Sequence, residues 1–410
     1  VAHPPFGKWM IAIGEWLFGA TPFGWRFVPA LAGTLSVLIL CRLARRMTGS
    51  TLLGCAAGLL LALDGLHFVT SRAALLDVFV MFWILAGFAC LVNDRDRSRR
   101  ILAERIEAGD RSAHGPFLAH GWRWAAGVCL GLACATKWTG VFYIAAFGLM
   151  VVLWDYGARR AAGVRSPFAG TMRLEAVPAF VQLVVVALGT YVATWWGWIF
   201  KPGGWGRGEV AGFVLWRPFE ALPDLWRYHA QIFGFHSGLD DEHPYQSWPW
   251  DWPILRRPVA FFYTEPEGAC GAGRCSREIL GIGTPALWWG ALAALVAVAF
   301  LWVMLRDWRA GAILLGFLAG WLSWFPSAFN DRTMFLFYAT PLIPFMVLPI
   351  VVVVGYLIGP APAAAQEARA SGDSLGQVAV EPAGAGTRRL VGAAAAGAFV
   401  LVVLANFAYF

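Results

Sequence analysis

The sequence carries too little charge to cover the surface of a soluble globular protein. Only 14% of its 410 residues are Asp, Glu, Lys or Arg, whereas 59% are hydrophobic. Soluble domains usually contain about 25% charged residues. The composition therefore argues against a soluble enzyme and predicts a protein that crosses a membrane several times.

Signatures of metal and nucleic-acid binding are also missing. The sequence has no CxxC pair. His229, His236 and His243 recur every seven residues, but Gly234 and Gly238 interrupt the segment that contains them. We therefore predict no metal site, and we expect no cofactor. The net charge of +7 comes mostly from arginines. These fall in short segments between apolar runs, so we expect no nucleic-acid partner.

Cysteine is scarce, with seven residues in the chain. Cys270 and Cys275 flank a glycine-rich CGAGRC segment outside the apolar runs, so we predict a small disulfide outside the cytoplasm. The remaining cysteines lie in or beside apolar runs and are expected to pack as small residues: Cys41, Cys55, Cys90, Cys129 and Cys134.

An initiator methionine is absent, because the chain starts at Val1. No signal peptide precedes the first motif. We expect the sequence to be an N-terminally truncated fragment of a longer protein.

Long apolar runs are abundant. A full membrane span needs roughly 20 apolar residues, and several runs are shorter. The run at 122–155 is too long for one ordinary span and contains Lys137. We predict two short helices there with a tight turn at Thr136–Thr139; one tilted helix plus a surface segment is the alternative. We thus predict an all-α polytopic membrane protein with about ten transmembrane helices, at 27–46, 51–66, 74–92, 122–136, 138–155, 176–199, 284–305, 310–326, 334–358 and 390–408.

The distribution of arginines orients these helices. Cytoplasmic loops are enriched in Lys and Arg, and alternate connecting segments of this chain carry clusters of Arg. We assign those segments to the cytoplasm; they contain Arg42, Arg45, Arg46, Arg95, Arg97, Arg99, Arg100, Arg105, Arg111, Arg159, Arg160, Arg165, Arg173, Arg306, Arg309, Arg369, Arg388 and Arg389.

This orientation divides the chain into six segments. Two of them lie outside the cytoplasm, and the first includes a helix too short to span, which we expect in the membrane interface. The segment at 359–389 is rich in Ala, Gly, Pro and Ser, which favours a flexible linker. The segments are an external segment with the interfacial helix (1–26), an N-terminal bundle of about six helices (27–199), a large external loop (200–283), further spans (284–358), a flexible cytoplasmic linker (359–389) and a last span (390–410).

The large loop contains an irregular aromatic stretch, HPYQSWPWDWPILRRP, at 243–258. Its prolines exclude a helix or a central strand. Its tryptophans offer flat rings to a sugar or a prenyl chain. A belt of rings at the membrane interface is the other interpretation.

Polar residues gather at the predicted external ends of the helices. In HPPFGK at 3–8, Lys8 either reaches lipid headgroups or contributes with His3 to a site. Lys137 is either an interfacial anchor or a contact for phosphate. Arg332, in the NDR segment at 330–332, belongs either to a charged cap between two spans or to the same site.

Arg72 and Asp77 form another polar group, just after the short helix that ends at Asp64. Asp77 lies one turn into an apolar helix, where an unpaired carboxylate costs roughly 2.5–3.5 kcal/mol. A local pair with Arg72 is one interpretation, although the spacing is not ideal on a helix. In the other interpretation, the Arg72 guanidinium binds a lipid phosphate.

Together these stretches resemble the protein O-mannosyltransferase family, in particular bacterial enzymes that use polyprenyl-phosphate mannose. Each stretch is short, but their order and density are specific. The external loop is too short for the β-trefoil domain that eukaryotic relatives insert there. The matching stretches are HPPFGK (3–8), LDGLHFVTSRAALLD (63–77), ATKWTG (135–140), HPYQSWPWDWPILRRPVAFFY (243–263), TPALWWG (284–290) and FNDRTMFLFYATPLIPF (329–345).

The resemblance implies the GT-C type fold of lipid-phosphate-sugar glycosyltransferases. It also implies an inverting transfer of mannose from polyprenyl-phosphate mannose to Ser or Thr hydroxyls of secreted proteins. The expected location is the plasma membrane with an extracytoplasmic active site, and the expected partners are membrane lipids and secreted acceptors at the translocon. A catalytic Asp-Glu pair is implied ahead of HPPFGK, so we expect the general base upstream of Val1 and full activity only when that part is present.

Residue roles follow from the same motif match. Arg72 and Lys137 are implied to bind the donor phosphate, with Arg72 the stronger candidate. Residues of the aromatic stretch at 243–258 are implied to shape the sugar and acceptor site, and charged residues near the helix ends are implied to support it. These are His243, Tyr245, Gln246 and Trp248 for the sugar and acceptor, and His3, Lys8, Asp64, Asp77 and Arg332 for support.

Two other functions remain open from the sequence. A related lipid-linked sugar transferase would use a lipid or polysaccharide acceptor with the same membrane architecture. A transporter or assembly scaffold would place its polar groups in mid-membrane or on both sides.

Overall fold

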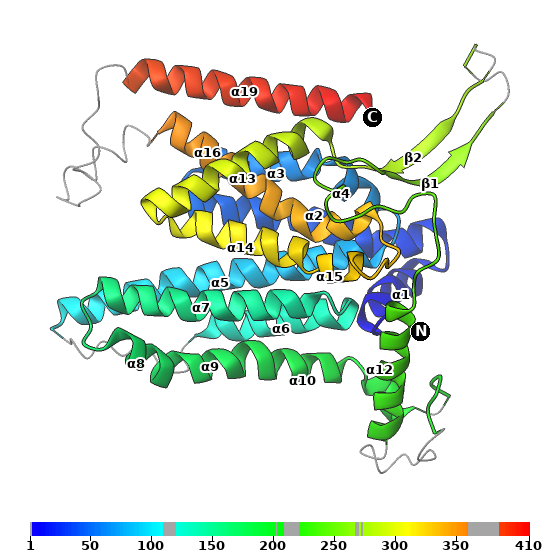
Figure 1. Ribbon diagram of the computed structural model, residues 1–410, viewed down its shortest axis with the longest axis horizontal. Coiled ribbons are helices and arrows are strands. Elements are labelled where there is room, and N and C mark those ends of the chain that lie inside the picture. Colours follow the sequence, from blue (N-terminus) through cyan, green and yellow to red (C-terminus); the bar gives the residue numbers. More distant parts are fainter. Residues whose placement is uncertain are drawn as a thin grey trace.

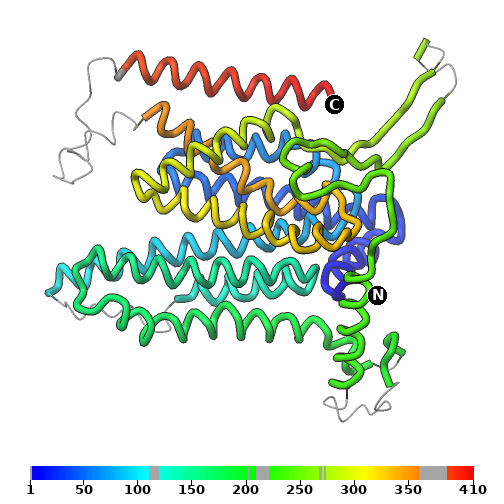
Figure 2. Tube along the Cα trace, in the orientation of Figure 1, coloured from blue at the N-terminus to red at the C-terminus, as the bar shows by residue number. Residues whose placement is uncertain are grey.

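The computed structural model describes residues 2–109, 120–201, 203–208, 221–266, 270–271, 274–359 and 385–410. Long helices lie side by side in this structure, and a β-hairpin and short helices gather at one end of them (Figures 1 and 2). Most of the linker predicted at 359–389 lies outside the described residues.

The longer helices form the body of the molecule. They are α2 (Pro22–Thr48), α3 (Thr51–Ala62), α5 (Leu76–Glu107), α6 (Gly121–Thr136), α7 (Gly140–Ala161), α13 (Pro285–Leu305), α14 (Trp308–Leu322), α16 (Ile343–Ile358) and α19 (Ala385–Tyr409). One further long segment is built from α8 (Pro167–Thr171), η1 (Met172–Ala176), α9 (Val177–Phe180), η2 (Val181–Val185) and α10 (Val186–Ala193), of which η1 and η2 are π-helical turns.

Shorter elements connect the long helices. They are α1 (Phe6–Phe18), α4 (Gly65–Thr70), α11 (Trp196–Phe200), α12 (Leu222–Ser237), α15 (Phe325–Ala328), the 3₁₀ helix η4 (Leu336–Leu342) and the strands β1 (Val259–Thr264) and β2 (Arg277–Gly281).

The predicted multi-span helical architecture is confirmed. In the described part of the chain, 8 helical segments are long and apolar enough to cross a membrane. Two further predicted runs form α3, with 12 residues, and α6, with 16. Both pack inside the bundle, α3 against α2 and α6 against α5. Each predicted apolar run therefore coincides with a helical segment.

The apolar run at 122–155 forms two helices, as predicted. α6 ends at Thr136 and α7 begins at Gly140, so the turn contains Lys137. A side chain at Gly140 would bring its Cβ within 2.7 Å of the backbone nitrogen of Cys134. Glycine thus permits the close turn, and the alternative of one tilted helix is wrong.

Three helix boundaries differ from the sequence prediction. α5 continues to Glu107 through the arginine-rich segment expected to be a loop, because that segment is rich in Arg, Leu, Ala and Glu, which form helix well, and reaches no glycine before Gly109. α2 begins at Pro22, because Thr21 caps it and proline suits the first helical turn. The run expected from residue 176 starts at Pro167.

The two ends of the bundle differ in chemistry. We call one end the loop end, because α1, α12 and the hairpin gather there (right in Figure 1). At the opposite end, here called the arginine end, Arg46 pairs with Asp96 at 2.7 Å. Arg95 lies 3.6 Å from the centre of the Trp308 ring at the same end. Arginines from separate connecting segments therefore meet at one end.

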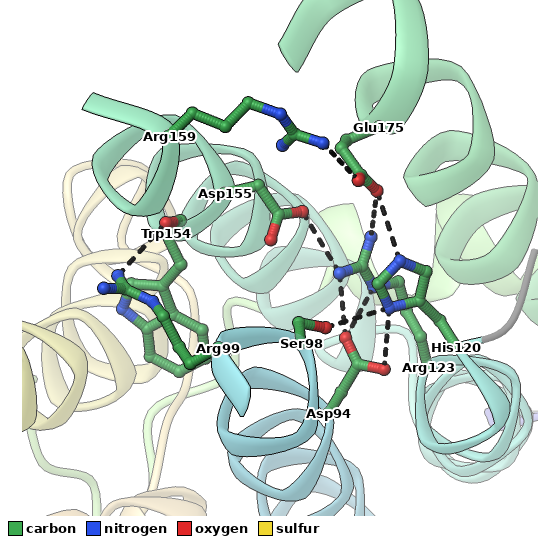
Figure 3. A network of polar contacts seen from close by, with 9 residues as sticks. All are labelled: Asp94, Ser98, Arg99, His120, Arg123, Trp154, Asp155, Arg159 and Glu175. Carbon is green, nitrogen blue, oxygen red and sulfur yellow. Dashed lines mark hydrogen bonds and ion pairs between the residues drawn. The ribbon is translucent and has the colours of Figure 1, made fainter. Parts of the chain in front are cut away.

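A buried ionic network crosses the arginine end (Figure 3). Arg123 of α6 contacts Asp94 of α5 at 2.8 Å and Asp155 of α7 at 3.1 Å. Glu175 of η1 accepts from Arg159 of α7 at 2.6 Å. The network thus ties four separate helical segments together, and we call it the ionic clasp.

His120 completes the ionic clasp at the start of α6. Its Nδ1 lies 3.1 Å from Asp94 and its Nε2 lies 3.3 Å from Glu175. Burial alone lowers the pKa of His120, but the two carboxylates outweigh burial and raise the pKa to about 9. The imidazolium therefore balances carboxylates from two helical segments.

The segment at 200–283 is more ordered than the sequence indicated. It contains α12 and an antiparallel pair of strands, with a bulge between Ala260 and Phe262. A disulfide joins Cys270 to Cys275. The aromatic stretch is irregular, as its prolines predicted, but Trp252 is fully buried in the core rather than in a surface belt.

Candidate active site

Lys137 is the central residue of the candidate site. It follows the last residue of α6, where a helix C-terminus favours a cation. Its Nζ donates a 2.7 Å hydrogen bond to Asp77 in the first turn of α5, and Lys137 is only 8% exposed. The rings of Tyr338 and Phe337 lie 5.0 and 5.9 Å from the Nζ atom. A buried ammonium group is thus held by one carboxylate and two aromatic faces.

Cationic side chains gather near His3: Lys137 and Arg332 both face the Tyr338 ring, and Lys8 contacts His3. Burial is the main reason why the pKa of His3 falls to about 3, and the nearby charges of Lys137, His236, Lys8 and Arg332 lower it further. The His3 ring lies 5.0 Å from the ring of His236. His3 is therefore a neutral imidazole inside a positive group, which we call the Lys137 cluster.

Lys8 joins this cluster through the first residues of the chain. Its Nζ donates to the carbonyl oxygen of His3 at 3.1 Å. Burial lowers the pKa of Lys8. Lys8 therefore turns back onto the HPPFGK segment instead of extending freely toward lipid headgroups.

Arg332 links three parts of the chain. Its Nε donates to the His236 carbonyl oxygen at 3.0 Å, and its Nη2 donates to His236 Nδ1 at 3.2 Å. His236 Nε2 then donates to the carbonyl oxygen of Ala2. The Nη1 atom of Arg332 is buried without a hydrogen-bond partner among the described residues. A positive donor therefore remains available for an anion within the Lys137 cluster.

The predicted pairing of Arg72 with Asp77 is not observed. Asp77 is only 4% exposed and needs a buried cation, which Lys137 supplies from another helix. Arg72 lies on an exposed turn, with its guanidinium 4.0 Å from the centre of the Phe68 ring. Asp77 therefore orients Lys137 rather than Arg72, and the structure does not bring Arg72 and Lys137 into one group of contacts.

Asp64 has a role in the fold. Its Oδ1 accepts from the backbone N–H of His67 and caps α4, at 2.8 Å. Its Oδ2 accepts from the indole N–H of Trp288 in α13 at 2.6 Å. Burial raises the pKa of Asp64 to about 6. The carboxylate joins α4 to α13.

The aromatic stretch at 243–258 borders an open cleft of about 870 Å³. His243, Gln246 and Trp248 line it, as do carboxylates from two segments, whereas Tyr245 packs its ring 5.7 Å from that of His243. The full lining is Asp240, Glu242, His243, Pro244, Gln246, Trp248, Arg257 and Asp331.

Two stacked rings connect the cleft to the Lys137 cluster. Phe335 lies 5.0 Å from the His243 ring, and Phe337 stacks on Phe335 at 5.3 Å. Phe337 is in turn one of the rings beneath Lys137. Ring contacts through Phe335 and Phe337 thus link His243, one of the predicted sugar and acceptor residues, to Lys137.

A hydrogen-bond relay that the sequence did not predict supports the Lys137 turn. The indole N–H of Trp138 donates to the Tyr191 hydroxyl at 3.1 Å, and that hydroxyl donates to His229 Nε2 at 2.6 Å. His229 Nδ1 donates to the Leu225 carbonyl at 2.7 Å. α12 runs unbroken through Gly234, contrary to the sequence prediction, and the seven-residue spacing of His229 and His236 on this helix was the available signal. Both point inward for hydrogen bonding, and the described residues contain no group arranged to hold a metal.

Known proteins match the whole chain. A family model described as dolichyl-phosphate-mannose-protein mannosyltransferase matches residues 1–190, and a model of the C-terminal four-span region of protein O-mannosyltransferase matches residues 221–410. A polyprenol-phosphate-mannose–protein mannosyltransferase of Mycobacterium tuberculosis is 39% identical over 421 aligned positions, covering 100% of this chain and 76% of that protein.

The chain belongs to the protein O-mannosyltransferase family. A family member from Corynebacterium glutamicum is 35% identical over 374 positions, which cover 88% of this chain and 71% of that protein. The solved yeast Pmt1–Pmt2 mannosyltransferase complex bound to its sugar donor has a chain with a TM-score of 0.70 at 13% identity, covering 99% of this chain and 82% of that one. This O-mannosyltransferase thus has the predicted GT-C fold.

Proposed function

We propose that this protein transfers mannose from polyprenyl-phosphate mannose to Ser or Thr hydroxyls of proteins. The observation that carries the proposal is the Lys137 cluster, a buried positive group with one carboxylate and an unpartnered guanidinium nitrogen. Such a group can stabilise the negative charge of a departing prenyl phosphate without a metal ion. The relatives named above are called polyprenol-phosphate-mannose–protein mannosyltransferases, which agrees with this chemistry and favours a protein acceptor over a lipid or polysaccharide.

The proposed reaction is a single displacement with inversion. The acceptor oxygen forms a bond to the anomeric carbon of mannose while the bond from that carbon to the phosphate oxygen breaks. The phosphate leaves with the bonding electrons, and the hydroxyl proton passes to a general base. We assign the general base to no residue of this chain.

The site residues divide the work between phosphate and acceptor. Lys137 and Arg332 contact the phosphate, and Asp77 keeps the Lys137 ammonium group oriented. Arg72 stays a proposed phosphate contact on the motif resemblance alone, since its guanidinium lies over the Phe68 ring on an exposed turn. His3 and Lys8 support the cluster through the start of the chain.

The acceptor side lies in the cleft. His243, Gln246 and Trp248 contact the sugar or the acceptor, since they line the cleft. Tyr245 fixes the His243 ring by donating its backbone N–H to Nδ1 at 3.1 Å. The stacked rings of Phe335 and Phe337 lie between the cleft and the Lys137 cluster, which supports a reaction in which donor and acceptor meet there.

The proposed location follows from the arginine end. Because positive loops remain in the cytoplasm, the loop end and its cleft face away from the cytoplasm. The protein then works in the plasma membrane on secreted acceptors, at the translocon. The polar residues of the cleft and the Lys137 cluster share the loop end, which favours an enzyme over a transporter.

Transfer assays test this function. Membranes that contain the natural protein are incubated with polyprenyl-phosphate [¹⁴C]mannose and a Ser/Thr-containing peptide, and the peptide is analysed for O-linked mannose by mass spectrometry. We expect labelled peptide. Labelling only of lipid or polysaccharide acceptors would contradict the proposed function.

A further inference from the structure

Adjacent residues of the NDR segment face two different environments. Arg332 belongs to the Lys137 cluster through His236 and Tyr338. Asp331 lines the cleft instead. Its backbone is left-handed, with φ of 53°, which turns the chain between the two side chains. A sharp change of charge therefore separates the cleft from the positive cluster.

The cleft is acidic in a protein whose net charge is +7. Asp240, Glu242 and Asp331 line it, whereas Arg257 is the cation of the lining and donates to the Pro244 carbonyl at 3.2 Å. The three acids are exposed, and in the described parts of the chain no ion pair joins any of them to a cation. The negative charge of these three carboxylates therefore acts within the cleft.

Backbone hydrogen bonds hold these acids together despite their like charge. The Thr333 N–H donates to the Leu239 carbonyl at 2.9 Å, and the Thr333 hydroxyl donates to the Asp241 carbonyl. The two acidic segments are thus fixed side by side on one rim. Like charges held close raise the local negative potential and attract cations.

We propose that this acidic rim selects the acceptor, binding polypeptide segments that carry Lys or Arg beside the accepting hydroxyl and rejecting segments that carry Asp or Glu. The inference rests on the proposed function, because it assumes that the acceptor enters through the cleft. Trp248 offers the acceptor backbone a flat face. The anionic donor is repelled by the rim and attracted by Arg332 and Lys137, so charge sorts the two substrates into adjacent compartments.

A set of matched peptides tests the selection. Three acceptor peptides have the same length and a single Thr. They differ only in the two residues that flank this Thr, which are both Lys, both Gln or both Glu. With the natural protein in membranes, kcat/KM should be highest for the Lys peptide and about tenfold lower for the Glu peptide, since each exposed charge pair contributes a few-fold. The ratio should shrink in about 0.5 M salt, where screening is strong.

A triple variant links the effect to the rim. In Asp240→Asn/Glu242→Gln/Asp331→Asn, the Lys-to-Glu ratio should fall close to one. The ratio is internal to each preparation, so it does not depend on the amount of folded protein. Glu15→Gln on α1 removes a carboxylate that does not line the cleft and should preserve the ratio.

The outcomes separate this inference from the proposed function. Equal kcat/KM for the Lys and Glu peptides with the natural protein, or an unchanged ratio in the triple variant, would overturn the acidic-rim proposal while the transferase function stands. No transfer to the Gln peptide, under conditions where the donor is intact, would count against the transferase function itself.

Discussion

Lys137 and Asp77 form a buried ion pair of 2.7 Å although they are 60 positions apart in the sequence. Lys137 ends α6 and Asp77 begins α5, so the pair ties the two helices together at the loop end. The pair also leaves the ammonium group facing Tyr338. A phosphate that enters the cluster would meet a cation already oriented by its carboxylate.

Replacement of Lys137 is expected to affect the chemical step most strongly. Lys137→Met should lower kcat by about 100-fold, because a preorganised charge is lost where negative charge develops. Lys201→Met removes an exposed lysine outside the cluster and should retain activity. Steady-state kinetics with saturating donor measures the difference. A kcat within a few-fold of the natural value would exclude Lys137 from the phosphate role.

Arg72→Ala is expected to reduce use of the donor without unfolding the protein. Because Arg72 lies on an exposed turn beside Phe68, its loss should raise the KM for the donor more than it lowers kcat. Arg26→Ala, at another exposed arginine beside a ring, is the matched control. Near-normal donor turnover in Arg72→Ala would remove this residue from the site.

The relay through Tyr191 is expected to hold the Lys137 turn in place. Tyr191→Phe removes the hydroxyl that Trp138 and His229 share. The variant should lose about 1 kcal/mol of stability for the hydrogen bonds and show a lower kcat with little change in donor KM. Tyr156→Phe on α7, which lies outside the relay, serves as the control. Equal kcat in both variants would refute this supporting role.

Breaking the ionic clasp should strongly destabilise the protein. Arg123→Met removes the buried cation that contacts Asp155 and leaves Asp94 with His120 alone, and an uncompensated buried charge costs about 3–5 kcal/mol. Arg100→Met removes an exposed arginine of α5 and should change little. Thermal unfolding in detergent gives the comparison. Similar midpoints for the two variants would show that the clasp contributes little.

Stability should decline at alkaline pH through His120. Its pKa is raised from about 6.5 in the unfolded chain to about 9 in the fold, because Asp94 and Glu175 outweigh burial and the opposing charge of Arg123. The contribution is therefore complete below about pH 6.5 and is lost as pH rises through about 9. His120→Gln should remove this part of the pH dependence. Unfolding midpoints measured from pH 6 to 10 that fall equally in both proteins would contradict the assignment.

Local sequence patterns were sufficient to locate the long apolar helices, but not α12. Apolar runs identified the helical segments, and Lys137 inside a long run predicted the α6–α7 turn, because a charge and a glycine end a short span. The boundary of α5 was missed because positive charge was taken as a loop signal, although those residues also form helix well. The short motifs identified the family for the same reason, since each is contiguous in the chain.

By itself, the sequence determined a multi-span helical protein with its arginines on alternate connections, and its motifs indicated the mannosyltransferase family. Only the tertiary structure decided that Asp77 serves Lys137 instead of Arg72, that His236 joins Arg332 to Ala2, and that Asp331 faces a cleft which Arg332 does not. Hydropathy reports which segments are apolar enough to lie in a membrane, whereas the pairing of distant charges depends on how the helices pack and on which buried charge lies within reach.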